Sequence, residues 1–289
     1  MSHIESSRAA PASTHIGGIR VLCRRAAEGS RAAAADSGRP ARVVMVHGAM
    51  DRATSFTRLM AKLPDCEVVA YDRRGYGHSS SLAAPADFAA QVADLAEVAS
   101  IGAEPNAVVA FGHSLGGDIV LATMQQHPGL FSGAVIWEAP MPWLKFWPND
   151  TASRGAGAKL GPEERAEWFM RRMVGDRIWE RLPAATRAAR RSEGRTLDTD
   201  FAYLEHGPVF DPAAITVPVT VGFGALSRPH QTMAAAELAS SLPFSSIVEI
   251  PESGHGAHIS HPGELSELIR SVVAFRGAAH GEQHERGVV

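Results

Sequence analysis

The sequence predicts an α/β fold with a mostly parallel central sheet, helices on both faces of that sheet and a helical cap inserted into the chain. Three observations support this. Short apolar runs alternate with stretches of helical spacing through most of the chain. The alternation stops between residues 141 and 212, where helical segments follow one another. A glycine-rich turn, Gly112–Gly116, joins one apolar run directly to a helix.

The expected elements follow in order. Apolar or alternating runs predict strands at 16–25, 42–46, 67–71, 107–111, 134–137, 218–223 and 246–250. Helical spacing predicts helices at 55–63, 85–101, 116–126, 231–242 and 265–275. Proline and glycine support the boundaries of one predicted helix, because Pro85 lies at its start and Gly102 follows its end. Core residues are therefore expected at 16–140 and 213–276, and the polar ends, 1–15 and 277–289, as flexible tails.

The insertion at 141–212 has its own composition. All five tryptophans lie between Trp137 and Trp179. Pro162 opens a helix in which Ala166, Phe169 and Met170 share one face. We expect these helices to lie on the sheet as a cap. The arginine-rich stretch 165–195 could favour an anionic substrate, but it is more typical of a solvated helix face.

Composition excludes several classes of function. The net charge of −3 and pI near 6.5 give no reason to expect a nucleic-acid partner. There is no membrane span and no signal-peptide pattern, so a cytoplasmic protein is expected. The two cysteines, Cys23 and Cys66, lie in or beside apolar runs and are expected as core residues. The oligomeric state stays open, a homodimer included.

The turn Gly112-His113-Ser114-Leu115-Gly116 matches the pattern G-x-S-x-G. Such a turn between a strand and a helix strains the backbone at the serine and lifts its hydroxyl clear of the sheet. The five-residue pattern alone is weak. Its setting, an apolar run before it and a helix after it, favours Ser114 as a nucleophile over an ordinary serine in a turn.

Four short motifs, taken in their order along the chain, are similar to those of a known protein family. His47-Gly48 follows the strand at 42–46, and Asp72-x-Arg74-Gly75-x-Gly77-x-Ser79 follows the next strand. The serine turn comes third, and Gly254-His255 follows the last strand. Together they resemble the α/β-hydrolase superfamily from about Ile16 to Phe275. The resemblance implies the α/β-hydrolase fold and a hydrolase that uses Ser, an acid and His beneath a helical cap.

His255 is the base that the resemblance implies, because it directly follows Gly254. His258 and His261 compete for the role within the same loop. His113 is next to the serine but should point away from it, since neighbours on an extended backbone face opposite sides. His47 is expected to support the loop that builds the oxyanion hole.

The acid is where the sequence departs from the commoner family pattern. The turn after the strand 218–223 has Ser227 where most members carry Asp, and a serine cannot serve as the anion. Some members place the acid after the strand that follows the nucleophile helix, and Glu138 occupies that position here. A carboxylate there would orient the imidazole and stabilise its cation. There are two alternatives. Glu138 could be a structural residue that bonds to nearby amides, or the site could have lost its acid and consist of Ser114 and His255 alone.

The remaining site residues concern the oxyanion and the substrate. The backbone amides of Leu115 and Ala49 are expected to form the oxyanion hole, with Met50 as the alternative second donor. Apolar side chains near the acid strand could line the substrate pocket or merely pack the cap onto the sheet. The residues expected in the pocket are Met50, Met141, Trp143 and Trp147.

The sequence therefore predicts a cofactor-independent serine hydrolase that cleaves carboxylic esters through an acyl-enzyme. A small-molecule ester or related acyl compound is the expected partner. No dinucleotide fingerprint and no metal-ligand spacing is present, so no cofactor and no metal is expected. The alternatives are lactone opening, C–C bond hydrolysis or perhydrolysis on the same residues. A non-catalytic ligand-binding protein on this fold is a further alternative.

Overall fold

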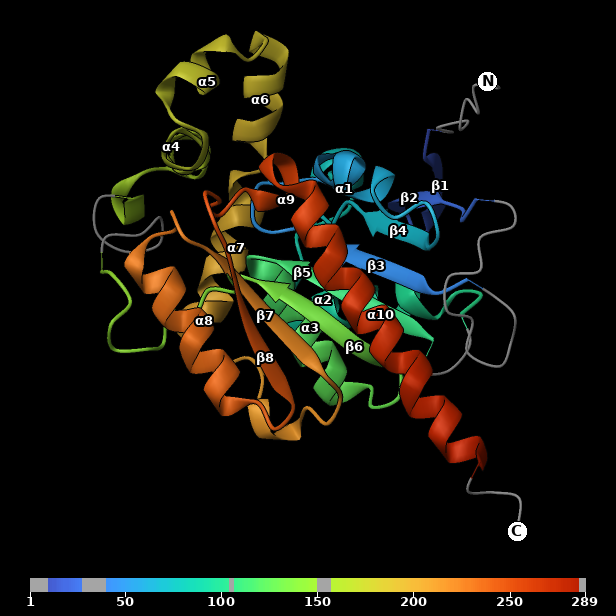
Figure 1. The fold of residues 1–289 in the computed structure, drawn as a ribbon. Coiled ribbons are helices and arrows are strands. Elements are labelled where there is room, and N and C mark those ends of the chain that lie inside the picture. The colour runs from blue at the N-terminus through green and yellow to red at the C-terminus, as the bar shows by residue number, and fades with distance from the viewer. Residues whose placement is uncertain (1–9, 28–39, 104–106, 150–156, 286–289) are drawn as a thin grey trace.

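A computed structural model describes residues 10–27, 40–103, 107–149 and 157–285, with side chains described up to residue 275. Its centre is an eight-stranded sheet in the order β1-β2-β4-β3-β5-β6-β7-β8 (Figure 1). The six strands from β4 to β8 in that order pair in parallel. These strands are β3 (Arg42–Val46), β4 (Glu67–Tyr71), β5 (Val108–His113), β6 (Phe131–Trp137), β7 (Val219–Gly224) and β8 (Ser245–Ile250). The mostly parallel sheet predicted from the alternating pattern is confirmed.

The N-terminal strand differs from the expectation. The stretch expected as one strand at 16–25 is the second half of an antiparallel hairpin, β1 (Ala12–Ile16) and β2 (Ile19–Arg24). Gly17 and Gly18 form the turn, and both have positive φ, at 54° and 86°. Two adjacent left-handed residues suit a two-residue hairpin turn. Residues 12–15, expected in the flexible arm, therefore belong to the sheet, because β1 pairs along its whole length with β2.

Helices cover both faces of the sheet (Figure 1). One face carries α2 (Phe88–Ser100), α3 (Leu115–Gln126) and α8 (Pro229–Ser241), whose apolar side chains share a core with alternate strand residues. The other face carries α1 (Thr57–Ala61), α9 (Ala257–Ser260) and α10 (Pro262–Glu285). Strands buried on both faces read as continuous apolar runs, which is why the sequence signal was strong.

The cap consists of short helices between β6 and β7 (Figure 1). They are α4 (Pro162–Val174), α5 (Asp176–Arg181), α6 (Ala184–Ser192) and α7 (Gly194–Glu205). Trp179, Met170 and Leu197 form a separate small core there, together with Met50 and Tyr76 from the sheet side. Residues 150–156 of the inserted segment lie outside the described residues.

The ends of the chain are described only in part. Residues 1–9 of the expected N-terminal tail and 286–289 of the expected C-terminal tail lie outside the described residues. Residues 277–285, also expected as tail, continue α10 as helix. Residues 28–39 and 104–106 also lie outside the described residues. Within the described ranges, no helix combines the length and the apolar character that crossing a membrane requires.

Candidate active site

The carboxyl ends of neighbouring parallel strands bring the candidate residues together. Ser114 follows β5 and Glu138 follows β6, and the Ser114 amide donates a hydrogen bond to the Trp137 carbonyl at 2.8 Å. His255 lies in the loop after β8. Since β5, β6, β7 and β8 are consecutive in the sheet, three segments distant in sequence end at one edge.

The turn at Ser114 is held in a strained conformation. The backbone of Ser114 has φ 53° and ψ −132°, outside the regions that residues other than glycine ordinarily adopt. Close packing around the turn requires glycine on both sides. A Cβ on Gly116 would lie 2.1 Å from the Val46 carbonyl oxygen, and one on Gly112 would lie 2.6 Å from the Gly117 Cα. The strand and helix therefore approach as closely as the glycine pattern predicted.

Glu138 and His255 form a hydrogen-bonded pair. The Glu138 side chain is fully buried, and its Oε2 lies 2.8 Å from His255 Nδ1. A carboxylate can only accept, so Nδ1 carries the proton and Nε2 is left with a lone pair. The Gln231 amide nitrogen also lies 2.9 Å from Nδ1, but it cannot donate to an atom that already holds a proton. Of the three loop histidines, His255 is the one that pairs with the acid.

The other oxygen of Glu138 has two donors that the sequence did not indicate. The Gly224 amide donates to Oε1 at 2.9 Å. The Ser227 hydroxyl donates to the same oxygen. Ser227 thus occupies the turn where most family members carry the acid, and it now holds the acid supplied by the neighbouring strand. Glu138 itself has φ 48°, a left-handed conformation that turns the chain sharply at the strand end.

The loop beside Ser114 is fixed by His47 and Arg73. His47 donates from Nδ1 to the Gly48 carbonyl at 2.8 Å, and its Nε2 accepts from the Arg73 amide at 2.9 Å. The Arg73 guanidinium donates to the carbonyls of His47 and Gly48 at 3.1 and 3.2 Å. His47 therefore supports this loop through hydrogen bonds, as expected.

Arg73 also joins this loop to the cap. Its guanidinium makes a two-pronged pair with Asp200 of α7, at 3.0 and 2.7 Å, and both side chains are fully buried. The Tyr76 hydroxyl donates to the same carboxylate at 2.7 Å. Sequence reasoning singled out Asp72 and Arg74 in this motif and passed over Arg73, because nothing in the local pattern shows which arginine turns inward.

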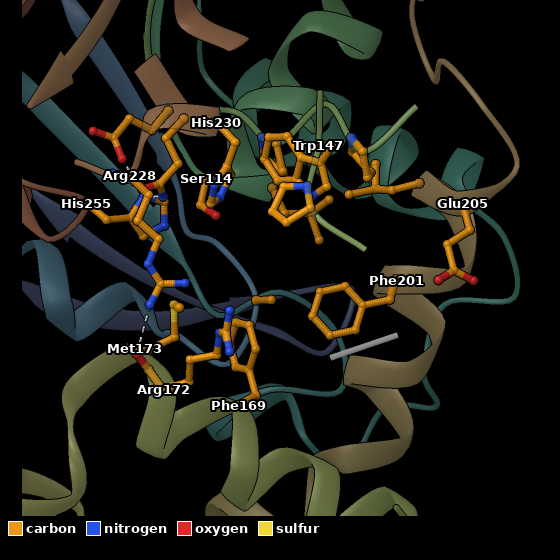
Figure 2. A pocket seen from close by; sticks show the side chains of 18 of the residues that line it. Ser114, Trp147, Phe169, Arg172, Met173, Phe201, Glu205, Arg228, His230 and His255 are labelled. Atoms are coloured by element: carbon orange, nitrogen blue, oxygen red, sulfur yellow. Dashed lines mark hydrogen bonds and ion pairs between the residues drawn. The ribbon is translucent and has the colours of Figure 1, made fainter. Parts of the chain in front are cut away.

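Two cavities meet at Ser114 and His255. The first is mainly apolar. The centre of a water molecule can occupy about 130 Å³ of it, whereas one bound water needs only about 10–15 Å³, so the cavity can hold a small ligand. Trp147, Phe169, Phe201 and Leu204 are among its walls, and Figure 2 shows the aromatic rings facing the side of the cavity where Ser114 lies. The second cavity has a mixed lining, in which the polar side chains of Asp51, His113 and His258 lie among apolar ones such as Met170.

The expected oxyanion and pocket residues fall into two groups. Ala49 and Leu115 line the first cavity beside Ser114, and so does Trp147. Met50 lines the second. Met141 and Trp143, expected in the pocket, line neither cavity. Met141 is buried in the main core, and Trp143 packs edge-on against Phe210 at 6.0 Å, so these two attach the segment after β6 to the sheet.

Two arginines lie at the meeting point of the cavities. Arg172 of α4 and Arg228 before α8 line both of them, and Figure 2 shows their side chains near Met173 and His255. Arg228 donates to the Arg172 carbonyl at 3.5 Å. The pKa of Arg228 is lowered by burial and by the neighbouring Arg172 charge. Arg172, which belongs to the arginine-rich stretch, is exposed and lines both cavities.

Comparison with known proteins identifies the family of the chain. The family model described as the alpha/beta hydrolase family matches residues 43–268. The chain belongs to this family. Among curated proteins, none matches the sequence significantly.

Solved structures of similar fold include the enol-lactonase from Burkholderia xenovorans LB400. It is 17% identical with a TM-score of 0.65, and the match covers 91% of this chain and 100% of that one. An esterase from Exiguobacterium antarcticum is 21% identical with a TM-score of 0.59, over 89% and 96% of the two chains. An alpha/beta hydrolase from Sphaerobacter thermophilus is 20% identical with a TM-score of 0.64, over 90% and 99%. At these identities the likeness concerns the fold.

Proposed function

We propose that this alpha/beta hydrolase cleaves carboxylic esters through an acyl-enzyme on Ser114, with His255 as the base and Glu138 as the acid, without a cofactor. The observation that carries the proposal is the buried Glu138 carboxylate at 2.8 Å from His255 Nδ1, in a cavity that Ser114 and His255 share. The carboxylate sets the imidazole in the form that can take a proton at Nε2. A serine hydroxyl needs such a base to become a nucleophile.

The first half of the reaction forms the acyl-enzyme. His255 Nε2 takes the proton of Ser114 Oγ as the oxygen attacks the ester carbonyl. The amides of Leu115 and Ala49 (or Met50) hold the resulting oxyanion. The Leu115 amide suits this role because it is at the first position of α3 and has no acceptor within the helix. Glu138 stabilises the imidazolium until its proton passes to the departing alcohol.

The second half releases the acid. Water replaces the alcohol, His255 takes a proton from it, and the hydroxide attacks the acyl carbon. The bond from that carbon to Ser114 Oγ then breaks, and His255 returns the proton to the serine oxygen. The apolar cavity with Trp147, Phe201 and Leu204 suits the acyl chain. The second cavity, which holds polar side chains such as Ser55 and Gln231 beside His255, suits the alcohol and the incoming water. The substrate is therefore an ester of an apolar acyl group.

Turnover of p-nitrophenyl esters together with fluorophosphonate labelling tests the proposal. Ser114→Ala should lose both, while Ser241→Ala, an exposed serine on α8, should keep both. Near-normal turnover by a well-folded Ser114→Ala would refute the serine mechanism. A parent protein that neither takes the label nor cleaves esters, thioesters or lactones would be a ligand-binding protein on this fold.

A further inference from the structure

Beside the candidate active site lies a group of three side chains to which no step of the proposed reaction assigns a role. Asp51 follows β3, His113 ends β5 and His258 lies on α9. One ligand atom from each comes within 4.8 Å of the other two. We propose that these three residues form a binding site for a divalent transition metal, Zn²⁺ in particular, and that metal bound there inhibits the hydrolase. The inhibitory part rests on the proposed function.

The hydrogen bonds of His113 leave one nitrogen ready to bind a metal. Its Nε2 lies 2.9 Å from the His255 carbonyl oxygen. A carbonyl can only accept, so Nε2 carries the proton and Nδ1 holds a lone pair. That Nδ1 is buried and has no hydrogen-bond partner within the described part of the chain. Histidines that bind metals typically donate their other ring N–H to a backbone carbonyl or carboxylate, which is the arrangement found here.

His258 presents a second buried ring beside that of His113. It is only 3% exposed, and among the described residues neither of its nitrogens has a hydrogen-bond partner. Its ring lies 4.2 Å from the His113 ring, centre to centre, and edge-on to Phe56 at 5.3 Å. Leaving buried polar atoms without partners is costly, and native proteins seldom do so without a reason. A metal ion could bind one nitrogen of His258 together with the free Nδ1 of His113.

Asp51 supplies the negative charge that a cation site needs. Its Oδ2 lies 3.4 Å from His258 Nε2, an ion-pair distance if the ring is protonated but not a hydrogen bond. Ser55 donates to the same oxygen at 2.9 Å, which holds the carboxylate in place. Two imidazoles and a carboxylate form a donor set that suits Zn²⁺ and related ions.

The distances between the ligand atoms of these three residues are near those of a metal-bound site. With metal–ligand bonds of about 2.0–2.1 Å, tetrahedral ligand atoms lie roughly 3.3–3.5 Å apart. The Asp51–His258 pair is already at this separation, and the group as a whole has to contract from 4.8 Å. All three residues line the second cavity, so a metal could enter from it and complete its coordination with water.

The position of the site explains why bound metal would inhibit. Ser114 directly follows His113 in the chain, and the His113 ring lies 4.7 Å from the His255 ring. The same cavity is the one that we assign to the leaving alcohol and water. A metal there would occupy that space and place a positive charge beside the imidazole that must itself become a cation.

Metal titration of the whole protein tests the site without relying on activity. We expect one equivalent of Zn²⁺ by calorimetry, and a visible absorption band of tetrahedral type with Co²⁺. His258→Gln and Asp51→Asn should each weaken binding at least tenfold. His261→Gln, three residues further on and outside the group, should bind as the parent does. Asp51→Asn at a partly exposed position guards against a folding failure in the buried His258 variant.

The outcomes separate the two proposals. Unchanged affinity in both ligand variants, or no Zn²⁺ binding by the parent, would overturn the site. If Zn²⁺ binds, ester turnover by the parent should fall and return with EDTA, and His258→Gln should resist this inhibition. Binding with undiminished turnover would overturn the inhibitory role alone. A parent without any ester turnover would count against the proposed function, while the Co²⁺ spectrum would still decide the site.

Discussion

His255 Nδ1 lies 2.8 Å from Glu138 Oε2, although 117 residues separate the two in the chain. The pair forms because β6 and the loop after β8 end at the same edge of the sheet. The Glu138 side chain is fully buried, whereas that of His255 is 26% exposed. The Glu138 carboxylate is thus shielded from water, while the His255 ring remains accessible from the cavity.

The charge of Glu138 should matter more than its shape. Glu138→Gln keeps the side-chain volume but removes the anion that orients and stabilises the imidazole. We expect kcat for a p-nitrophenyl ester to fall by roughly 10²–10⁴, with KM little changed. A variant as active as the parent would make Glu138 a structural residue.

Ser227 should have a smaller but measurable effect. The structure shows that this hydroxyl donates to Glu138 Oε1, and that the Gly224 amide donates to the same oxygen. Ser227→Ala removes one of the two donors, so we expect kcat to fall by about 3- to 10-fold, on the scale of one hydrogen bond of about 1 kcal/mol. Ser227→Thr, which retains a hydroxyl, should recover part of the loss, and equal losses in both variants would refute this role.

Asp200 should anchor the cap. Asp200→Ala leaves the fully buried Arg73 guanidinium without its carboxylate, and removing one partner of a buried pair costs about 3–5 kcal/mol. Urea unfolding should show a loss of this size. Asp198→Ala on the same helix is the control, because its pair with Arg165 is partly exposed and should contribute about 1 kcal/mol or less. Similar losses of unfolding free energy in the two variants would show that the buried pair contributes no more to stability than the partly exposed pair.

The sequence was sufficient to predict features that depend on a local pattern of residues. It was not sufficient to predict contacts that depend on packing between segments distant in the chain. Apolar runs gave the parallel strands, and glycine spacing gave the strained turn at Ser114. The resemblance to family members that carry the acid after this strand predicted Glu138 as the residue that pairs with His255. The partners Ser227, Arg73 and Asp200 were missed because a hydrogen bond across the fold leaves no periodic signal. Met141 and Trp143 were misplaced because apolar residues in a core and in a pocket look alike in a sequence.

His47 should make stability depend on pH in the acid range. Burial, together with the Arg73 charge, lowers the pKa of His47 from 6.5 to about 4. The neutral ring is the form required by its bonds, because Nε2 accepts from the Arg73 amide. Between pH 6.5 and 4 the unfolded chain therefore binds the proton and the folded chain does not. Stability from this group is fully present above pH 6.5 and is lost as the pH falls toward 4.

The expected loss is on the order of 3 kcal/mol across this window, about 1.4 kcal/mol per pH unit at most. Urea unfolding at several pH values from 7 to 4.5 measures it. His113, whose pKa burial also lowers, acts in the same direction, so the informative quantity is the difference from His47→Gln. That variant should be less stable at pH 7 but should lose less on acidification. His127→Gln, at an exposed histidine, should follow the parent curve. If His47→Gln and the parent decline in parallel, the buried imidazole at position 47 is not the group that titrates.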